Sequence, residues 1–431
     1  MDYLFKNATV VRPEGILKNV YVAVKDGKIF SIGNEFAENI DNYEIIDAEN
    51  KVILPGLINA HTHIPMTLLR GYADDYDLHT WLNDYIFPAE AKLDSRSVKA
   101  GSLLGIAEAI MSGTTSFSDM YYFCDDIIEA VLETGMKANV SRGLSLFGDF
   151  DKNTHQGFCE LKSMKERWHK FDNGRIIIEA SIHAEYTSDE RLWRCVADYA
   201  MENELGIQVH LSETKSEHEE CIKKYGKTPT ELFLDAGVWD TRAIAAHGVH
   251  VTDSDMDILA SKNVNIVHNP VSNGKLGSGI CRVPELIKKG INVALGTDGV
   301  SSNNSHDMFE EMKTAILLQR ASRLTPSALS KWDVFKMATV NGAKAQGRAD
   351  ECGEIKEGMD ADIILLDFNK PRLVPCNDAV SNIVFSASGG EVCLTMCRGE
   401  ILYQNGELKT LDLEKVLWEV RNYAVPKVLN V

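Results

Sequence analysis

The feature that most constrains this sequence is a regular alternation of short apolar runs and amphipathic stretches through its middle. The apolar runs are rich in β-branched residues and have the length of buried strands, and the stretches between most of them have helical periodicity. Strands that alternate with helices predict parallel βα units, and eight such units close into a (β/α)8 barrel. The eight predicted strands end near residues 63, 119, 142, 183, 213, 247, 268 and 298.

The two ends of the chain have a different pattern. Residues 3–11 and 20–33 are typical of strands, and Asp26-Gly27 predicts a type I′ hairpin. Beyond Gln346 the pattern returns to β. We therefore predict an α/β fold, a TIM-type barrel with a small flanking β-sandwich domain built from both termini. The predicted boundaries are 1–54 and 349–431 for the two parts of the small domain and 55–348 for the catalytic barrel.

Charge and composition exclude several classes of function. The formal net charge of −18 argues against a nucleic-acid partner, because phosphate binding needs clustered Lys and Arg. The chain has no run of about 18 apolar residues and no basic-then-apolar leader, so we expect neither a membrane partner nor a signal peptide. Nine scattered cysteines in such a chain predict reduced thiols and a cytoplasmic location. A homo-oligomer is left open.

Two histidines close the first predicted barrel strand. His61 and His63 are one residue apart, and alternate residues of a strand point to the same side, so both imidazoles face one point. Imidazole is the commonest protein ligand of divalent transition metals. The pair alone does not establish a site, because His-x-His also occurs by chance.

Further polar residues follow other predicted strands. The carboxyl ends of barrel strands form one face, so side chains at successive strand ends share a pocket. A catalytic metal takes a few protein ligands and leaves a position for water, whose pKa it lowers toward ~7. Spacing alone does not choose the ligands, since buried histidines also serve as core groups and an aspartate can cap a helix. The candidates are His183, His210, Glu213, His247 and Asp298.

In their order along the chain, these motifs resemble those of the amidohydrolase superfamily. Within it, the chain is most similar to the 5-methylthioadenosine/S-adenosylhomocysteine deaminases, and the resemblance covers essentially the whole sequence. The strand-four end, Ser181-Ile182-His183, lacks the lysine that bridges two metals in other members, which favours one metal. The matching segments are 55–63, 78–82, Glu90, 141–142, 183–184, 209–213, 246–250, 268–276, 296–299 and 358–362.

The resemblance implies a set of roles. One divalent metal ion is expected, for which Zn²⁺ suits the ligands and Fe²⁺ or Mn²⁺ would also be suitable. The implied metal ligands are His61, His63, His210 and Asp298. The implied substrate contacts are Trp81, Glu90, Arg142, His183, Glu213 and Asp298, and the implied catalytic residues are Glu213, His247 and Asp298.

The implied reaction is hydrolytic deamination of an adenine nucleoside by a metal-activated hydroxide. The expected substrates are 5'-methylthioadenosine, S-adenosylhomocysteine and adenosine, which give inosine analogues and ammonia. Glu213 would protonate N1 of the ring and Asp298 would take the proton of the water. His247 would polarise the hydroxide or stabilise the developing charge.

Two alternatives stay open at this point. One is another reaction at the same site, such as deamination of guanine or cytosine or dechlorination of a triazine ring; Glu90 and Trp81, which suit a ribose, argue against it. The other is a barrel that serves only as an assembly scaffold, against which the complete ligand set argues. Arg142 is the evident cation for an amino-acid carboxylate, with Lys152 as a candidate assistant, so the preferred nucleoside is not decided.

Overall fold

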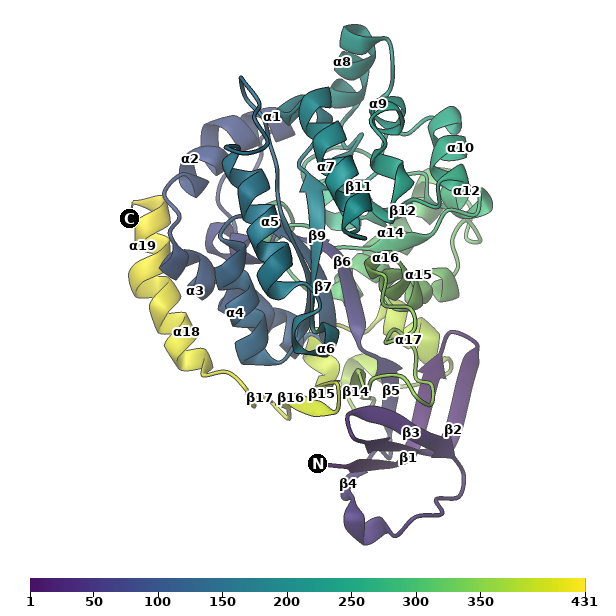
Figure 1. The fold of residues 1–431 in the computed structure, drawn as a ribbon. Helices are drawn as coiled ribbons and strands as arrows, with labels where there is room; N and C mark the ends of the chain where they lie inside the picture. Colours follow the sequence, from purple (N-terminus) through teal and green to yellow (C-terminus); the bar gives the residue numbers. More distant parts are fainter. Residues whose placement is uncertain (431) are drawn as a thin grey trace.

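The computed structural model describes residues 1–430, and its centre is a barrel of parallel strands (Figure 1). Within these residues, eight strands pair in chain order, and the predicted fold class is confirmed. The barrel closes where the Asp298 N–H donates to the His61 carbonyl (3.0 Å). The strands are β6 (Leu57–Thr62), β7 (Thr114–Tyr121), β8 (Lys137–Arg142), β9 (Ile176–Ile182), β10 (Ile207–Leu211), β11 (Ala243–His247), β12 (Asn265–His268) and β13 (Val293–Leu295).

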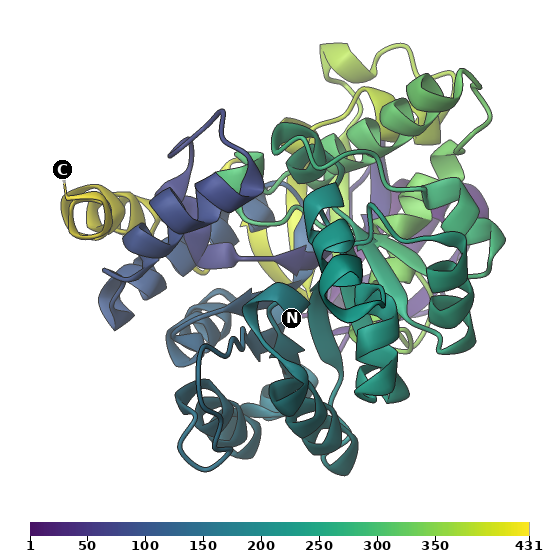
Figure 2. The same ribbon diagram turned by 90° about the horizontal axis from the view of Figure 1, so that it is seen from above.

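Helices surround the strands (Figure 2). Several begin at capping boxes, as at Asp94 before α3 and Thr214 before α8, where side chains satisfy free N–H groups of the first turn. The main outer helices are α3 (Ser95–Met111), α4 (Cys124–Thr134), α5 (Gln156–Trp168), α7 (Glu190–Glu202), α8 (Lys215–Tyr225), α9 (Pro229–Asp235), α10 (Asp253–Ser261), α12 (Val283–Lys288), α14 (Met308–Arg323), α15 (Lys331–Met337) and α16 (Val340–Gln346). Shorter helical turns are α6 (Phe171–Gly174), η4 (Glu185–Thr187), η5 (Val238–Asp240), α11 (Pro270–Lys275) and α13 (Val300–Asn303).

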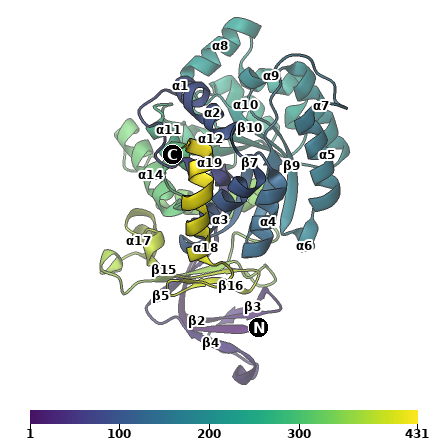
Figure 3. The ribbon, with the colours of Figure 1, turned by 90° about the vertical axis from the view of Figure 1, so that its left-hand side faces the viewer.

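Both termini build a second, mixed sheet beneath the barrel (Figure 3). Its strands follow one hydrogen-bonded path, β17-β16-β15-β14-β5-β1-β2-β3, with β4 beside β1. Asp26 and Gly27 both have positive φ (52° and 77°), as a type I′ turn requires. The strands are β1 (Tyr3–Arg12), β2 (Gly15–Lys25), β3 (Lys28–Gly33), β4 (Glu44–Asp47), β5 (Lys51–Pro55), β14 (Ile363–Asp367), β15 (Val392–Cys397), β16 (Glu400–Gln404) and β17 (Glu407–Leu408).

The sheet and the barrel are held together at the lower end of the barrel. The buried Lys137 ammonium of β8 lies 2.7 Å from Asp360 and 2.8 Å from Asp362, so two carboxylates neutralise it. The last helices, α18 (Leu413–Glu419), η8 (Val420–Ala424) and α19 (Val425–Leu429), run along α3 of the barrel (Figure 3). The remaining short elements are η1 (Ile40–Asn42), η6 (Pro371–Leu373), α17 (Ala379–Phe385) and η7 (Gly389–Glu391).

A string of short helices follows β6 and covers the mouth of the barrel. The sequence predicted no elements there, because its apolar residues follow no sustained period. Trp81, Leu82 and Ile86 are buried and hold the segment against the barrel. Its elements are η2 (Ile64–Leu69), α1 (Leu78–Thr80), η3 (Trp81–Ile86) and α2 (Phe87–Glu90). None of the helices in residues 1–430 combines the length and apolar character that crossing a bilayer requires.

Candidate metal centre and active site

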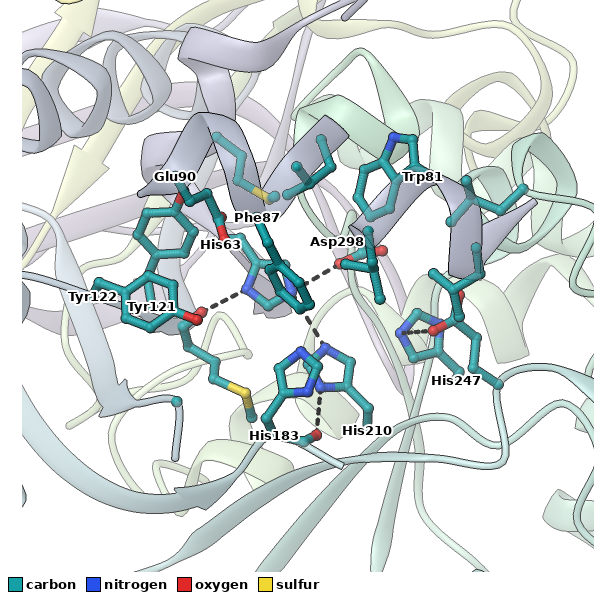
Figure 4. A pocket seen from close by; sticks show the side chains of 18 of the residues that line it. His63, Trp81, Phe87, Glu90, Tyr121, Tyr122, His183, His210, His247 and Asp298 are labelled. Atoms are coloured by element: carbon teal, nitrogen blue, oxygen red, sulfur yellow. Dashed lines mark hydrogen bonds and ion pairs between the residues drawn. The ribbon is translucent and has the colours of Figure 1, made fainter. Parts of the chain in front are cut away.

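Four side chains meet at the carboxyl end of the barrel strands, and three of them, His63, His210 and Asp298, are labelled in Figure 4. Each offers one ligand atom, and these atoms all lie within 4.8 Å of one another. Asp298 Oδ1 lies 3.2 Å from His63 Nε2 and 3.6 Å from His61 Nε2. The members of this ligand cluster are His61, His63, His210 and Asp298.

The hydrogen bonds of the cluster show that it suits a cation. His63 donates from Nδ1 to the Met120 carbonyl (2.5 Å), and His210 donates from Nδ1 to the His183 carbonyl (2.7 Å). In the neutral imidazoles both Nε2 atoms then carry lone pairs, and they face each other at 3.3 Å. Both ring nitrogens of the buried His61 lack a hydrogen-bond partner within the described structure. A divalent ion satisfies these unpaired donor atoms together.

Asp298 is fixed by its neighbours. It lies just beyond β13 in the left-handed region (φ 61°), a conformation unfavourable for a residue with a side chain. Its Oδ2 accepts hydrogen bonds from Ser272 (2.6 Å) and Ser302 (2.9 Å), which leaves Oδ1 facing the histidines. Gly296 permits this arrangement, because a Cβ there would lie 2.7 Å from the His61 carbonyl oxygen.

The pKa shifts of the cluster differ between its members. Burial opposes protonation of His63, but the Asp298 carboxylate outweighs it and raises the pKa of His63 to about 9, so a cation that binds here displaces a proton from this imidazole. Burial lowers the pKa of His61 to about 4, so this imidazole is neutral. Burial opposes ionisation of Asp298, but the adjacent imidazoles of His61 and His63 outweigh it and hold the pKa of this carboxyl well below its usual range. The site therefore presents a carboxylate at neutral pH.

Glu213 and His247 lie beside the cluster. Glu213 Oε2 is 3.6 Å from His247 Nε2, and its Oε1 accepts a hydrogen bond from Ser278 (3.3 Å). Burial raises the pKa of Glu213 to about 7, so a large fraction of this carboxyl carries a proton at neutral pH. His247 Nδ1 is bonded to Asn273 Oδ1 (2.9 Å). Burial opposes protonation of His247, but Glu213 and Asp298 outweigh it and raise its pKa.

The opposite wall of the pocket is aromatic with one acid (Figure 4). Trp81 and Phe87 come from the short helices after β6. Tyr121 is the last residue of β7, and Tyr122 follows it. Burial raises the pKa of Glu90 to about 7, although a hydrogen bond from Tyr121 opposes the rise. Such a wall can stack on a flat ring system and accept hydrogen bonds from hydroxyl groups.

The structure places most of the predicted site residues on this pocket. His61 lies beneath it, and Arg142 points into a neighbouring cleft. Lys152 is exposed on a loop and lines neither cavity in the described chain. The predicted residues that line the pocket are His63, Trp81, Glu90, His183, His210, Glu213, His247 and Asp298.

Sequence reasoning missed Tyr121 and Tyr122. The predicted strand stopped at Asp119, whereas β7 continues to Tyr121. The histidines were selected because side chains at the ends of barrel strands share a pocket. The same argument would have selected these tyrosines if the prediction had extended β7 to its full length. Ser272 and Ser302 were also missed, because no spacing pattern in a sequence indicates which serines will donate hydrogen bonds to the Asp298 carboxylate.

Comparison with known proteins gives a consistent result. The amidohydrolase family matches residues 52–402. A 5-methylthioadenosine/S-adenosylhomocysteine deaminase from Acetivibrio thermocellus is 44% identical over 429 residues, which are 98% of this chain and 99% of that protein. A 5'-deoxyadenosine deaminase from Methanosarcina acetivorans is 43% identical over 98% of each chain.

Solved structures agree with the fold. An adenosine deaminase from Xanthomonas campestris with bound zinc has a TM-score of 0.93 and 30% identity, covering 100% of this chain and 99% of that one. An atrazine chlorohydrolase from Arthrobacter aurescens complexed with zinc has a TM-score of 0.91 at 21% identity, covering 98% and 100%. The second likeness concerns the fold alone.

Proposed function

The chain belongs to the amidohydrolase family, and from this premise we propose that it is a metal-dependent deaminase of adenine nucleosides. It hydrolyses the C6–amino bond of nucleosides such as 5'-methylthioadenosine, S-adenosylhomocysteine and adenosine, and releases the inosine analogue and ammonia. The observation that carries this conclusion is the juxtaposition of the ligand cluster with a proton-bearing Glu213 and an aromatic wall that contains Glu90. Relatives of 40–44% identity named for the same chemistry support it.

We propose Zn²⁺ as the ion, with Fe²⁺ or Mn²⁺ as alternatives for the same nitrogen and oxygen ligands. His61, His63, His210 and Asp298 would hold it. Such an ion would make a water molecule acidic enough to serve as the nucleophile at neutral pH.

The residues around the cluster move the protons. As the water oxygen adds to C6, Glu213 donates its proton to N1 of the ring, and Asp298 accepts the proton of the water. The amino group takes up that proton and leaves as ammonia. The remaining proton of the attacking oxygen passes to Glu213 as the C6 carbonyl forms, and N1 keeps its hydrogen in the inosine product. His247, whose pKa is raised beside Glu213 and Asp298, donates a hydrogen bond to the developing negative charge.

The aromatic wall orients the nucleoside. We propose that Trp81 packs on the nucleoside, that Glu90 accepts hydrogen bonds from the ribose hydroxyls and that His183 contacts the substrate from the end of β9. Arg142 faces the 5' substituent from the neighbouring cleft. A free base or a triazine has no hydroxyls for Glu90, which argues against these rings as substrates.

We also propose a reducing compartment such as the cytoplasm, because the cysteines of residues 1–430 are free thiols.

The test is a deamination assay followed by ultraviolet absorbance, on protein whose metal content has been measured. We expect turnover of at least one of adenosine, 5'-methylthioadenosine and S-adenosylhomocysteine, loss of turnover after chelation, and recovery when Zn²⁺ is restored. Inactivity on all three with one metal bound per chain would contradict the proposed substrate class.

A further inference from the structure

A cleft of about 880 Å³ adjoins the active-site pocket. Phe87, Glu90 and Tyr122 line both cavities, so the two lie on either side of the same side chains. If Glu90 binds the ribose, as the proposed function on which this inference rests requires, the 5' substituent of the nucleoside enters this cleft. Its charged lining residues are Glu90, Asp125, Asp126, Arg142, Glu160 and Arg167.

Arg142 is already occupied by groups of the protein. Its Nε donates to Glu160 Oε2 (2.5 Å), and its Nη1 donates to the Gly143 carbonyl (2.5 Å). The guanidinium carbon lies 4.5 Å from the centre of the Tyr122 ring. Gln156, one turn earlier on α5, donates to the other oxygen of Glu160 (2.8 Å). The Arg142–Glu160 pair is therefore held in place on both sides.

The rest of the cleft offers no uncompensated cation among its described residues. Arg167 lies 2.8 Å from Asp125 Oδ2, which compensates its charge. Asp126 accepts a hydrogen bond from the Ser95 hydroxyl (2.6 Å), and no arginine of the cleft is paired with it in the described structure. Glu160 and Asp125 compensate the two guanidinium groups of the lining, so in the part of the chain that the structure describes the cleft presents no free positive charge to a substrate carboxylate.

We propose that Glu160 is a specificity-determining residue, which holds Arg142 and directs the enzyme toward adenine nucleosides whose 5' substituent has no carboxylate. A methylthio or 5'-deoxy group enters the cleft without disturbing the pair. Glu160 and the Gly143 carbonyl already use Nε and Nη1 of Arg142, so a substrate carboxylate that binds this guanidinium must share it with the Glu160 carboxylate or displace it. The ammonium group of S-adenosylhomocysteine reduces the cost of this competition, because it can lie against Asp126, the carboxylate that no arginine of the cleft compensates.

The test compares kcat/KM for three nucleosides on the metal-loaded enzyme. They are 5'-propylthio-5'-deoxyadenosine, S-adenosylhomocysteine and 5'-(carboxyethylthio)-5'-deoxyadenosine, which differ in the charge at the end of a 5' thioether. For the wild type we expect efficiency to fall in this order, with roughly tenfold or more between the first and the last. Glu160→Gln should reduce that ratio to within about threefold, mainly by raising the efficiency on the carboxylate substrate.

Two further variants make the result decisive. Glu166→Gln makes the same chemical change at an exposed position of the same helix and should leave the ratio unchanged. Arg142→Gln frees Glu160 and should widen the ratio, which tests the inference even if Glu160→Gln does not fold.

The inference is overturned if the wild type uses the carboxylate substrate as well as the neutral one. It is also overturned if Glu160→Gln and Glu166→Gln change the ratio equally. Turnover of the neutral nucleoside in either case leaves the proposed function standing, whereas no turnover of any nucleoside removes both.

Discussion

The two walls of the pocket come from different kinds of structure. The ligand cluster lies on and immediately beyond β6, β10 and β13, whose positions are fixed by the ladder of the barrel. Trp81, Phe87 and Glu90 come instead from the short helices between β6 and α3, which are held by a few buried side chains. Residues on strand ends are positioned more firmly than residues on a connecting segment.

This difference separates chemistry from recognition. The strand-end wall contains the proposed metal ligands and the proposed proton donor, so changes there should act on turnover. The segment wall is proposed to contact the parts of the nucleoside that do not react, so changes there should act on KM. Mutations in each wall therefore test whether effects on turnover and effects on KM are separated in this way.

The largest effect is expected for Asp298→Ala. Loss of the carboxylate removes one ligand and leaves three buried imidazoles without their charged partner, so metal content should fall and kcat should drop by roughly 10⁴-fold or more. Metal analysis and the deamination assay measure both. Asp119→Asn, a change within β7 and outside the cluster, should retain the metal; equal metal loss in both variants would argue against the assigned ligand set.

Glu213→Gln should keep the metal and still lower kcat by roughly 10² to 10⁴-fold, because the amide cannot donate a proton to the ring nitrogen as the carboxyl does. Steady-state kinetics and metal analysis on the same sample measure the two quantities. Glu219→Gln, an exposed change on α8, is the matched control. A wild-type rate in Glu213→Gln would remove this residue from the mechanism.

Glu90→Gln tests the other wall. Loss of a charged acceptor for the ribose hydroxyls should raise KM by roughly tenfold to a hundredfold and change kcat much less. Asp84→Asn, an exposed change in the same segment, should leave KM unaltered. A fall in kcat without a rise in KM would break the proposed division between the walls.

The smallest effect is a pH dependence. Because burial raises the pKa of Glu213 to about 7 and the protonated form is the acid, kcat/KM should fall as the pH rises above this value, approaching about tenfold per pH unit. Profiles of kcat/KM against pH for wild type and Glu213→Gln measure it. If the fall in kcat/KM at high pH persists unchanged in Glu213→Gln, a group other than Glu213 produces it.

Much of the barrel was predictable because its strands are buried on both sides. Runs such as Ile176–Ile182 are almost continuously apolar, and the helices between them are periodic, so both the order and the type of the elements follow from the sequence. The His-x-His pair could be placed on one side of β6 for the same reason.

The segment after β6 was not predictable in this way. Residues 78–90 form one continuous helical run whose middle, Trp81–Ile86, is a π-helix, so its apolar residues do not follow the 3.6-residue period of an α-helix. Its position depends on packing of Trp81 and Ile86 against the rest of the barrel. The pairing of Arg142 with Glu160 depends on β8 and α5 being neighbours in space, which no local motif reports. The resemblance named the proposed metal ligands and several proposed substrate contacts, but the packing of the segment after β6 and the partner of Arg142 required the structure.

The place where the first and last barrel strands meet, here called the seam of the barrel, lies at the ligand cluster. The first and last barrel strands meet there through the Asp298–His61 backbone bond and through Asn59, which bonds to Thr297 at 2.7 Å and 3.0 Å. A ligand that binds only the folded chain adds RT ln(1 + [L]/Kd) to the free energy of unfolding. Because His61 and Asp298 lie on opposite sides of this seam, an ion bound by both residues would link the first barrel strand to the last. The catalytic cofactor is then also a determinant of thermal stability.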